Sequence, residues 1–161
     1  MNTVPQISET SPLAVMHDHA IDKLATFYIG DQMFGVSVDY VQGILQLDKI
    51  FNIPLGPSNV AGLINLRGHI VTVLDLRVYL GMTQPEQTSS HRPMCITVEH
   101  KGTLYGLLVD RVGDVLDCPH DQMDIVPQTV AKPWRSLCSG IYRLDKKLLL
   151  ILSIEQMFEV E

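Results

Sequence analysis

FGVSVDYV at residues 34–41 and YGLLVDRV at residues 105–112 are two copies of one sequence pattern, 71 positions apart. A second pair of blocks follows in the same order, because residues 62–75 match residues 140–153 at an offset of 78 positions. All four blocks combine short apolar runs with turn residues. Two blocks repeated in the same order predict a duplicated β unit, since chance apolar similarity would not preserve the order.

From Leu24 onward the sequence consists of short apolar runs separated by turn residues, which is typical of barrels and sandwiches. Glycine-containing turns predict three β-hairpins: residues 24–29 with 32–38, residues 62–66 with 69–74, and residues 94–99 with 103–110. Two short helices are predicted at residues 76–80 and 154–158, with Asp75 and Ser153 as their N-caps. The change of offset between the blocks predicts an insertion within residues 117–139.

These features predict an all-β chain of two similar lobes, each a small β-barrel whose closure removes free sheet edges. With the lobes taken in chain order, the first spans about residues 24–81, a linker spans residues 82–92, and the second spans about residues 93–161. Residues 1–22, rich in Ser, Thr and Pro, are expected to form a mobile tail. A groove between the lobes is the expected binding surface. A single irregular β-sandwich is the alternative fold.

The charge balance narrows the kinds of partner. Eighteen acidic and 12 basic residues among 161 give a net charge of −6, which disfavours binding to nucleic acid and to anionic lipid. The sequence shows no signal-peptide pattern, and its strongest apolar run, residues 148–152, is too short to insert across a membrane. The cysteines Cys95, Cys118 and Cys138 form no CxxC pair, so reduced thiols of a cytosolic protein are expected.

No catalytic constellation is predicted. The sequence has no Gly-x-Ser-x-Gly elbow, P-loop, dinucleotide-binding fingerprint or His-Glu-x-x-His motif. Asp39 and Asp110 occupy equivalent places in the repeat, and each is expected to accept hydrogen bonds from nearby backbone where a strand ends. His17 and His19 are too few to make a metal site. We therefore predict a protein with no catalytic residue, no metal and no cofactor.

The two copies differ most at one hairpin turn. The first copy has Asn-Leu-Arg-Gly-His at residues 65–69, and the second has Arg-Leu-Asp-Lys-Lys at residues 143–147. Different turns on a shared framework suit a binding protein that makes two different contacts. Arg67 is well suited to an interface, because a guanidinium can hold a carboxylate through two hydrogen bonds and stack on apolar surface. An ordinary solvated arginine is the alternative.

The same segments resemble the chemotaxis coupling proteins, the CheW-like family. The resemblance rests on Val-Ala-Gly-Leu-Ile-Asn-Leu-Arg-Gly at residues 60–68, Ile-Val-x-Val-Leu-Asp-Leu-Arg at residues 70–77 and Gly-Leu-Leu-Val-Asp at residues 106–110. It extends from about residue 24 to residue 158, nearly the whole chain beyond the expected tail. Membership would imply two five-stranded SH3-like barrels and a non-enzymatic adaptor.

Adaptors of this family link the cytoplasmic tips of methyl-accepting chemoreceptors to the regulatory domain of the CheA-type histidine kinase, which is itself CheW-like. The resemblance thus implies a cytoplasmic protein held at the inner membrane through receptor arrays. Its expected partners are chemoreceptors, the kinase and other CheW-like domains. Two alternatives stay open: an adaptor of a related surface-sensing or pilus-motility pathway, and a small-molecule-binding enzyme that uses the groove between the lobes.

The resemblance also suggests contact residues. The candidates on the receptor side, where a helical hairpin would lie in the inter-lobe groove, are Val36, Val38, Ile44, Asn65 and Arg67. Gly102 and Gly140 are the candidates on the kinase side, because small residues at strand ends would let a partner approach closely.

One position departs from the family pattern. Similar proteins commonly have Val-Gln-Glu-Ile where this chain has Val-Gln-Gly-Ile at residues 41–44. The carboxylate expected near Arg67 is therefore missing, and Gly43 stands in its place. Arg67 is predicted to lack a partner within its own lobe.

Overall fold

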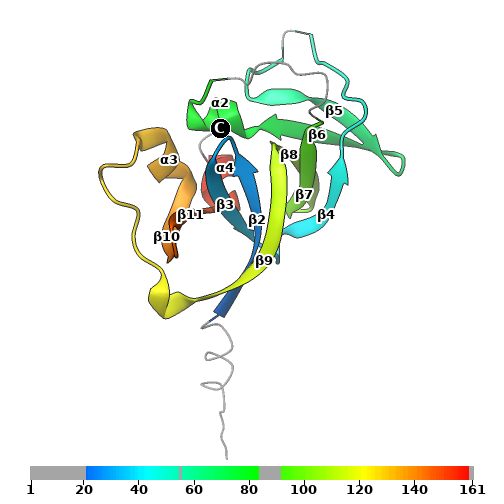
Figure 1. Cartoon of the computed structure of the whole chain (residues 1–161). Coiled ribbons are helices and arrows are strands. Elements are labelled where there is room, and N and C mark those ends of the chain that lie inside the picture. Colours follow the sequence, from blue (N-terminus) through cyan, green and yellow to red (C-terminus); the bar gives the residue numbers. More distant parts are fainter. Residues whose placement is uncertain (1–20, 55, 84–91, 160–161) are drawn as a thin grey trace, which may run out of the picture.

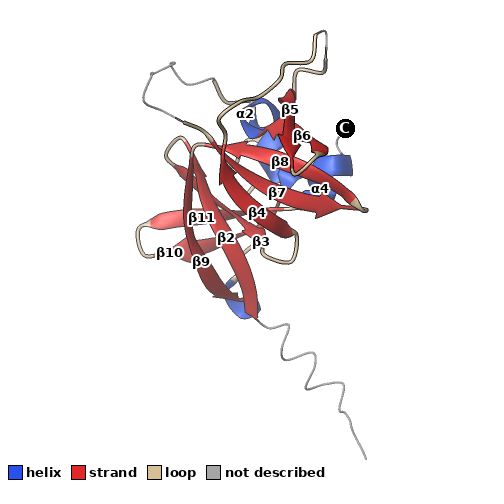
Figure 2. Cartoon of the chain, turned by 90° about the vertical axis from the view of Figure 1, so that its right-hand side faces the viewer, coloured by secondary structure: helices blue, strands red, loops and turns tan. Residues whose placement is uncertain are grey.

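The computed structural model describes residues 21–54, 56–83 and 92–159, and nearly all of its regular structure is β-strand (Figures 1 and 2). The strands are β2 (Ile21–Ile29), β3 (Gln32–Ser37), β4 (Val41–Gln46), β5 (Val60–Leu66), β6 (His69–Asp75), β7 (Met94–His100), β8 (Thr103–Val109), β9 (Arg111–Pro119), β10 (Cys138–Leu144) and β11 (Lys147–Leu152). The helices are α2 (Leu76–Leu80), the 3-10 turn η1 (His120–Gln122), α3 (Lys132–Leu137) and α4 (Ile154–Glu159).

The strands form two five-stranded sheets, which lie beside each other in Figure 1. The first sheet has the order β10-β11-β3-β2-β9, and the second has the order β4-β7-β8-β6-β5. The three predicted hairpins are present as the antiparallel pairs β2–β3, β5–β6 and β7–β8. The all-β class and the two five-stranded units are therefore confirmed.

The assignment of lobes in chain order is wrong, because each sheet takes strands from both halves of the chain. Strands β2 and β3 of the first half join β9, β10 and β11, while β7 and β8 of the second half join β4, β5 and β6. Parallel pairing of β11 with β3 and of β6 with β8 connects the exchanged hairpins. The repeat identifies equivalent strands, but it carries no information on which copy supplies a strand's neighbour.

Each sheet curls so that its two outer strands are brought together. In the second sheet, Phe51 in the loop after β4 forms a bridge with Leu63 of β5. In the first sheet, Asp124 in the loop after β9 forms the equivalent bridge with Ile141 of β10. These bridges occupy backbone groups that would otherwise be left at open sheet edges.

Three apolar clusters hold the structure together. The largest joins the two sheets and includes Phe34 of the first sheet and Ile96 of the second, both fully buried. A smaller cluster lies in each sheet, around Leu149 in the first and around Val71 in the second. Burial of apolar area on this scale is the main force that stabilises a domain of this size.

The ends of the short helices follow the predicted caps. Asp75 accepts a hydrogen bond from the backbone N–H of Arg77 at the start of α2, and Gly81 ends the helix in the left-handed conformation. Ser153 accepts from the backbone N–H of Gln156 at the start of α4. Helix α3 and the turn η1 were not predicted, but both fall within the predicted insertion.

Asp110 has a wider role than predicted. Its carboxylate accepts from the backbone N–H of Gly30, in the β2–β3 turn, and forms a largely buried ion pair with Arg77 of α2. It therefore connects the first sheet with the helix that follows the second sheet, whereas the sequence suggested only local backbone contacts.

Two predicted boundaries also change or lie outside the described residues. Strand β2 begins at Ile21, so the ordered chain starts inside the segment predicted as a tail. Residues 1–20, and residues 84–91 of the predicted linker, lie outside the described part of the chain.

Candidate functional site

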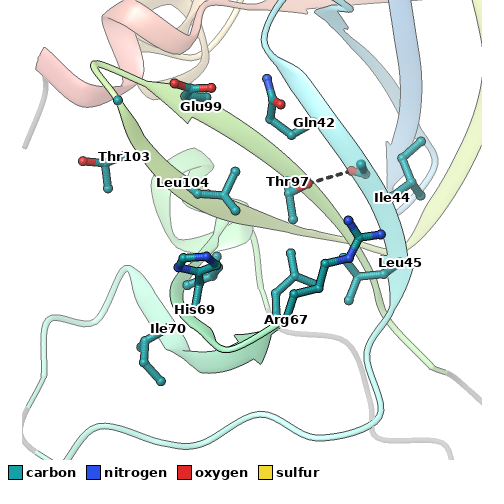
Figure 3. A pocket seen from close by; sticks show the side chains of 14 residues that line it. Gln42, Ile44, Leu45, Arg67, His69, Ile70, Thr97, Glu99, Thr103 and Leu104 are labelled. Atoms are coloured by element: carbon teal, nitrogen blue, oxygen red, sulfur yellow. Dashed lines mark hydrogen bonds between the residues drawn. The ribbon is translucent and has the colours of Figure 1, made fainter.

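A groove of about 720 Å³ lies at one end of the second sheet (Figure 3). Strand β4 supplies Ile44 and Leu45, the β5–β6 hairpin supplies Arg67 and Ile70, and β8 supplies Leu104. All the residues that line it belong to the second sheet or to its hairpin turns. The expected inter-lobe position is therefore wrong for this groove, because strand exchange places its walls within one sheet.

The floor of the groove is built around a bulge in β4. The β4–β7 pairing shifts register between Val41 and Gly43. The buried hydroxyl of Thr97, on β7, donates a hydrogen bond of 3.1 Å to the carbonyl oxygen of Gly43. A β-bulge leaves ladder groups unpaired, and this hydroxyl satisfies one of them.

Arg67 lies at the turn between β5 and β6 in the left-handed conformation, with φ of 53°, and Gly68 follows with φ of 85°. Two successive positive φ angles are those of a tight two-residue hairpin turn. The side chain extends from this turn toward β4 and ends beside Leu45 (Figure 3). Among residues 21–54, 56–83 and 92–159, no side chain forms an ion pair or hydrogen bond with its guanidinium, which agrees with the prediction made from Gly43.

The predicted receptor-side residues separate into two groups. Ile44, 46% exposed, and Arg67 both line the groove. Val36 is fully buried in the central cluster and Val38 packs against that cluster, so the structure does not bring them to this surface. Asn65 accepts a hydrogen bond of 3.0 Å from the backbone N–H of Gly68, which gives it a role in shaping the turn.

The two predicted kinase-side glycines lie in different sheets. Gly102 is exposed at the β7–β8 turn and lines the rim of the groove, together with the receptor-side candidates. Gly140 is buried in β10, where an added Cβ would lie 2.8 Å from Met123 and 3.1 Å from the carbonyl oxygen of Asp124. The premise of an open surface around Gly140 is therefore wrong.

Several groove residues were missed by the sequence analysis. Ile70 is 67% exposed, which is unusual for an isoleucine in a β-strand, and it stands beside His69 on the rim. Leu104 and Glu99 complete the wall formed by the β7–β8 hairpin. Their positions next to the predicted turns at 67–68 and 101–102 were the available signal.

A smaller hollow of about 320 Å³ adjoins the groove, because Glu99 contributes to both. Phe158 of α4 stacks on His100, with ring centroids 4.5 Å apart. The Tyr40 hydroxyl donates a hydrogen bond of 3.1 Å to Glu155. Burial and this hydrogen bond to the carboxylate raise the pKa of Tyr40, so the phenol stays protonated and keeps α4 attached to the start of β4.

Comparison with known proteins agrees with this architecture. The family described as the CheW-like domain matches residues 23–161. The chain belongs to the CheW-like family. A protein named as a probable chemotaxis protein CheW of Rhizobium etli is 31% identical over 136 residues, covering 84% of this chain and 86% of the relative. The chemotaxis protein CheW of Rhizobium meliloti is 30% identical over 139 residues, covering 86% and 88%.

A solved CheW-like structure has the same fold. The crystal structure of the scaffolding protein TtCheW from Thermoanaerobacter tengcongensis matches with a TM-score of 0.75 and 28% identity, covering 87% of this chain and 89% of that one. Together these matches confirm the predicted family and the predicted class of chemotaxis coupling adaptor. None of the helices within residues 21–54, 56–83 and 92–159 is long and apolar enough to span a bilayer.

Proposed function

We propose that this chain couples the helical tips of methyl-accepting chemoreceptors to the regulatory domain of a CheA-type histidine kinase, on the cytoplasmic side of the membrane. Its membership of the CheW-like family supports this role, because the relatives are chemotaxis proteins and one is a scaffolding protein. The proposal assigns no catalytic step to the chain. The protein acts by holding two partners at once.

The groove of the second sheet is the proposed receptor site. A helix that docks in a groove presents apolar side chains at helical spacing, and Ile44, Ile70 and Leu104 offer matching apolar surface. Arg67 adds a cation at the edge of this surface and is unpaired within the described part of the chain. The best fit is a helix with an apolar face and a carboxylate placed to reach Arg67. This combination of exposed apolar side chains and a free guanidinium carries the proposal.

The kinase needs a surface that does not overlap the groove. Gly102 was the predicted kinase contact, but it shares the groove rim with Arg67 and Thr103. A receptor helix in the groove would therefore compete with a kinase domain centred on Gly102. We place the main kinase contact elsewhere on the molecule.

The test is formation of a ternary complex from purified components. The full chain is mixed with a soluble receptor tip fragment and the isolated kinase regulatory domain, and the mixture is analysed by size-exclusion chromatography with light scattering. The proposal predicts one peak that contains all three proteins, and two binary complexes when either partner is left out. Mutually exclusive binding of the two partners would contradict it.

A further inference from the structure

The duplication relates the groove to an equivalent place at the end of the first sheet. At the offset of 71 residues, Thr97 corresponds to Thr26, and each of these buried threonines donates its hydroxyl proton to a carbonyl oxygen of the neighbouring strand. At the same offset Glu99, which lines the groove, corresponds to Tyr28. The first sheet thus carries an aromatic ring where the second sheet has an open, acidic wall.

Two cations lie against the Tyr28 ring. The guanidinium carbon of Arg111, from β9, is 4.1 Å from the ring centroid. The Lys147 amine, from β11, is 5.1 Å from the centroid and donates a hydrogen bond of 3.2 Å to the Tyr28 hydroxyl. Cation–π contacts position these charges over the ring without neutralising them. Three strands therefore bring together two positive charges and a hydroxyl that can still donate its proton.

These two cations differ from the other basic residues of the first sheet and its neighbouring helix. Lys23, Arg77 and Arg143 each have an aspartate partner. Within the described residues, Arg111 and Lys147 have no acidic partner, and the Arg111 guanidinium donates no hydrogen bond. Both side chains are exposed, in a chain with a net charge of −6. Self-repulsion does not explain an unpaired basic pair in an acidic protein, whereas an acidic partner does.

We propose that Tyr28, Arg111 and Lys147 form a second docking surface that binds a carboxylate-bearing protein surface, and that its occupant is the kinase regulatory domain. The assignment to the kinase rests on the proposed function, which requires a contact separate from the groove. The chemistry fits carboxylates because a guanidinium can bind one through two parallel hydrogen bonds, while Lys147 and the Tyr28 hydroxyl bind a neighbouring one. The surface lies on the first sheet and leaves the groove of the second sheet free for the receptor.

Isothermal titration calorimetry with the isolated kinase regulatory domain tests this inference. The variants are full chains carrying Arg111→Gln, Lys147→Gln or both, each first shown to melt like the unchanged protein. The control carries Lys49→Gln and Lys132→Gln, which remove the same total charge at other exposed positions. We expect the double variant to lose at least about tenfold in affinity for the kinase domain, with a shallower dependence on salt. The control should lose less than about threefold.

Binding of the receptor fragment separates the possible failures. We expect all these variants to bind the receptor fragment as the unchanged protein does. Unchanged kinase affinity in a folded Arg111→Gln/Lys147→Gln variant would overturn the inference while leaving the proposed function intact. Loss of receptor binding instead of kinase binding would overturn the assignment of the occupant. If the unchanged protein binds neither partner, the proposed function itself fails.

Discussion

Thr97 and Gly43 are joined by a hydrogen bond from the threonine hydroxyl to the glycine carbonyl oxygen at the bulge of β4. A Cβ added at Gly43 would lie 3.3 Å from that hydroxyl oxygen, so a side chain fits here with a small adjustment of Thr97. Arg67 lines the same groove. The family's common glutamate at this position is thus sterically possible, and its absence leaves Arg67 available to a partner.

The first prediction follows from restoring that carboxylate. Gly43→Glu should weaken binding of the receptor fragment by at least about fivefold, because an internal carboxylate would compete with the partner for Arg67. Gly43→Ala introduces the same Cβ without the charge and should change the affinity less than about twofold. Calorimetric titration of both variants measures the effect. Equal weakening by Glu and Ala would mean that bulk, and not charge, is responsible.

The second prediction removes the guanidinium itself. Arg67→Ala should weaken receptor binding at least tenfold, since losing one member of an ion pair that is buried on binding costs about 2–5 kcal/mol. The melting temperature should change little, because the side chain is exposed and unpaired in the described part of the chain. Arg67→Lys keeps the charge but loses the two-pronged donor geometry, and it should give an intermediate affinity. Full affinity in Arg67→Ala would show that this arginine is merely solvated.

The sequence predicted local structure better than it predicted the site. The turns at residues 30–31, 67–68 and 101–102 and the cap at Asp75 depend on neighbouring residues, and the structure has all of them. The exchange of hairpins between the sheets depends on parallel pairing between distant strands, which a repeat does not reveal.

The same limit explains the outcome for the site residues. Ile44 and Arg67 were found because one turn and one departure from the family pattern mark them. Val36 alternates with polar neighbours as a groove residue would, but its alternate face forms the central core. Gly140 looks like an accessible strand-end glycine until the insertion, which carries Met123, folds over it.

The third prediction concerns Gly140. Gly140→Ala should lower the free energy of unfolding by about 1–3 kcal/mol, because its Cβ would lie 2.8 Å from the Met123 side chain. Met123→Ala in the same chain removes the obstructing atoms and should recover part of that loss. Urea denaturation of the single and double variants measures both values. An undiminished stability of Gly140→Ala would contradict the close packing of the insertion on β10.

The fourth prediction is a loss of stability at alkaline pH. Burial raises the pKa of the Cys95 and Cys138 thiols from 9.0 to about 12. Above pH 9.0 the unfolded chain releases these protons while the folded chain keeps them, so the free energy of unfolding falls as pH rises toward about 12. The limiting slope is about 1.4 kcal/mol per pH unit for each thiol.

Urea denaturation at about pH 8 and about pH 10.5 measures this loss. The variant Cys138→Ala is the control, because it lacks one of the two thiols and should lose less stability between the two pH values. An equal loss in both proteins would assign the alkaline effect to other groups, such as Tyr142, whose pKa burial also raises to about 12.

The central claim is that the groove of the second sheet receives the receptor helix, and methyl NMR spectroscopy tests it most directly. The fifth prediction is that adding a receptor tip fragment to chain labelled at isoleucine and leucine methyls shifts the signals of Ile44, Ile70 and Leu104. Ile125, 86% exposed in the loop that follows β9 and η1, is the internal control and should not shift. Shifts confined to methyls of the first sheet, with Ile44 and Ile70 unchanged, would contradict the account.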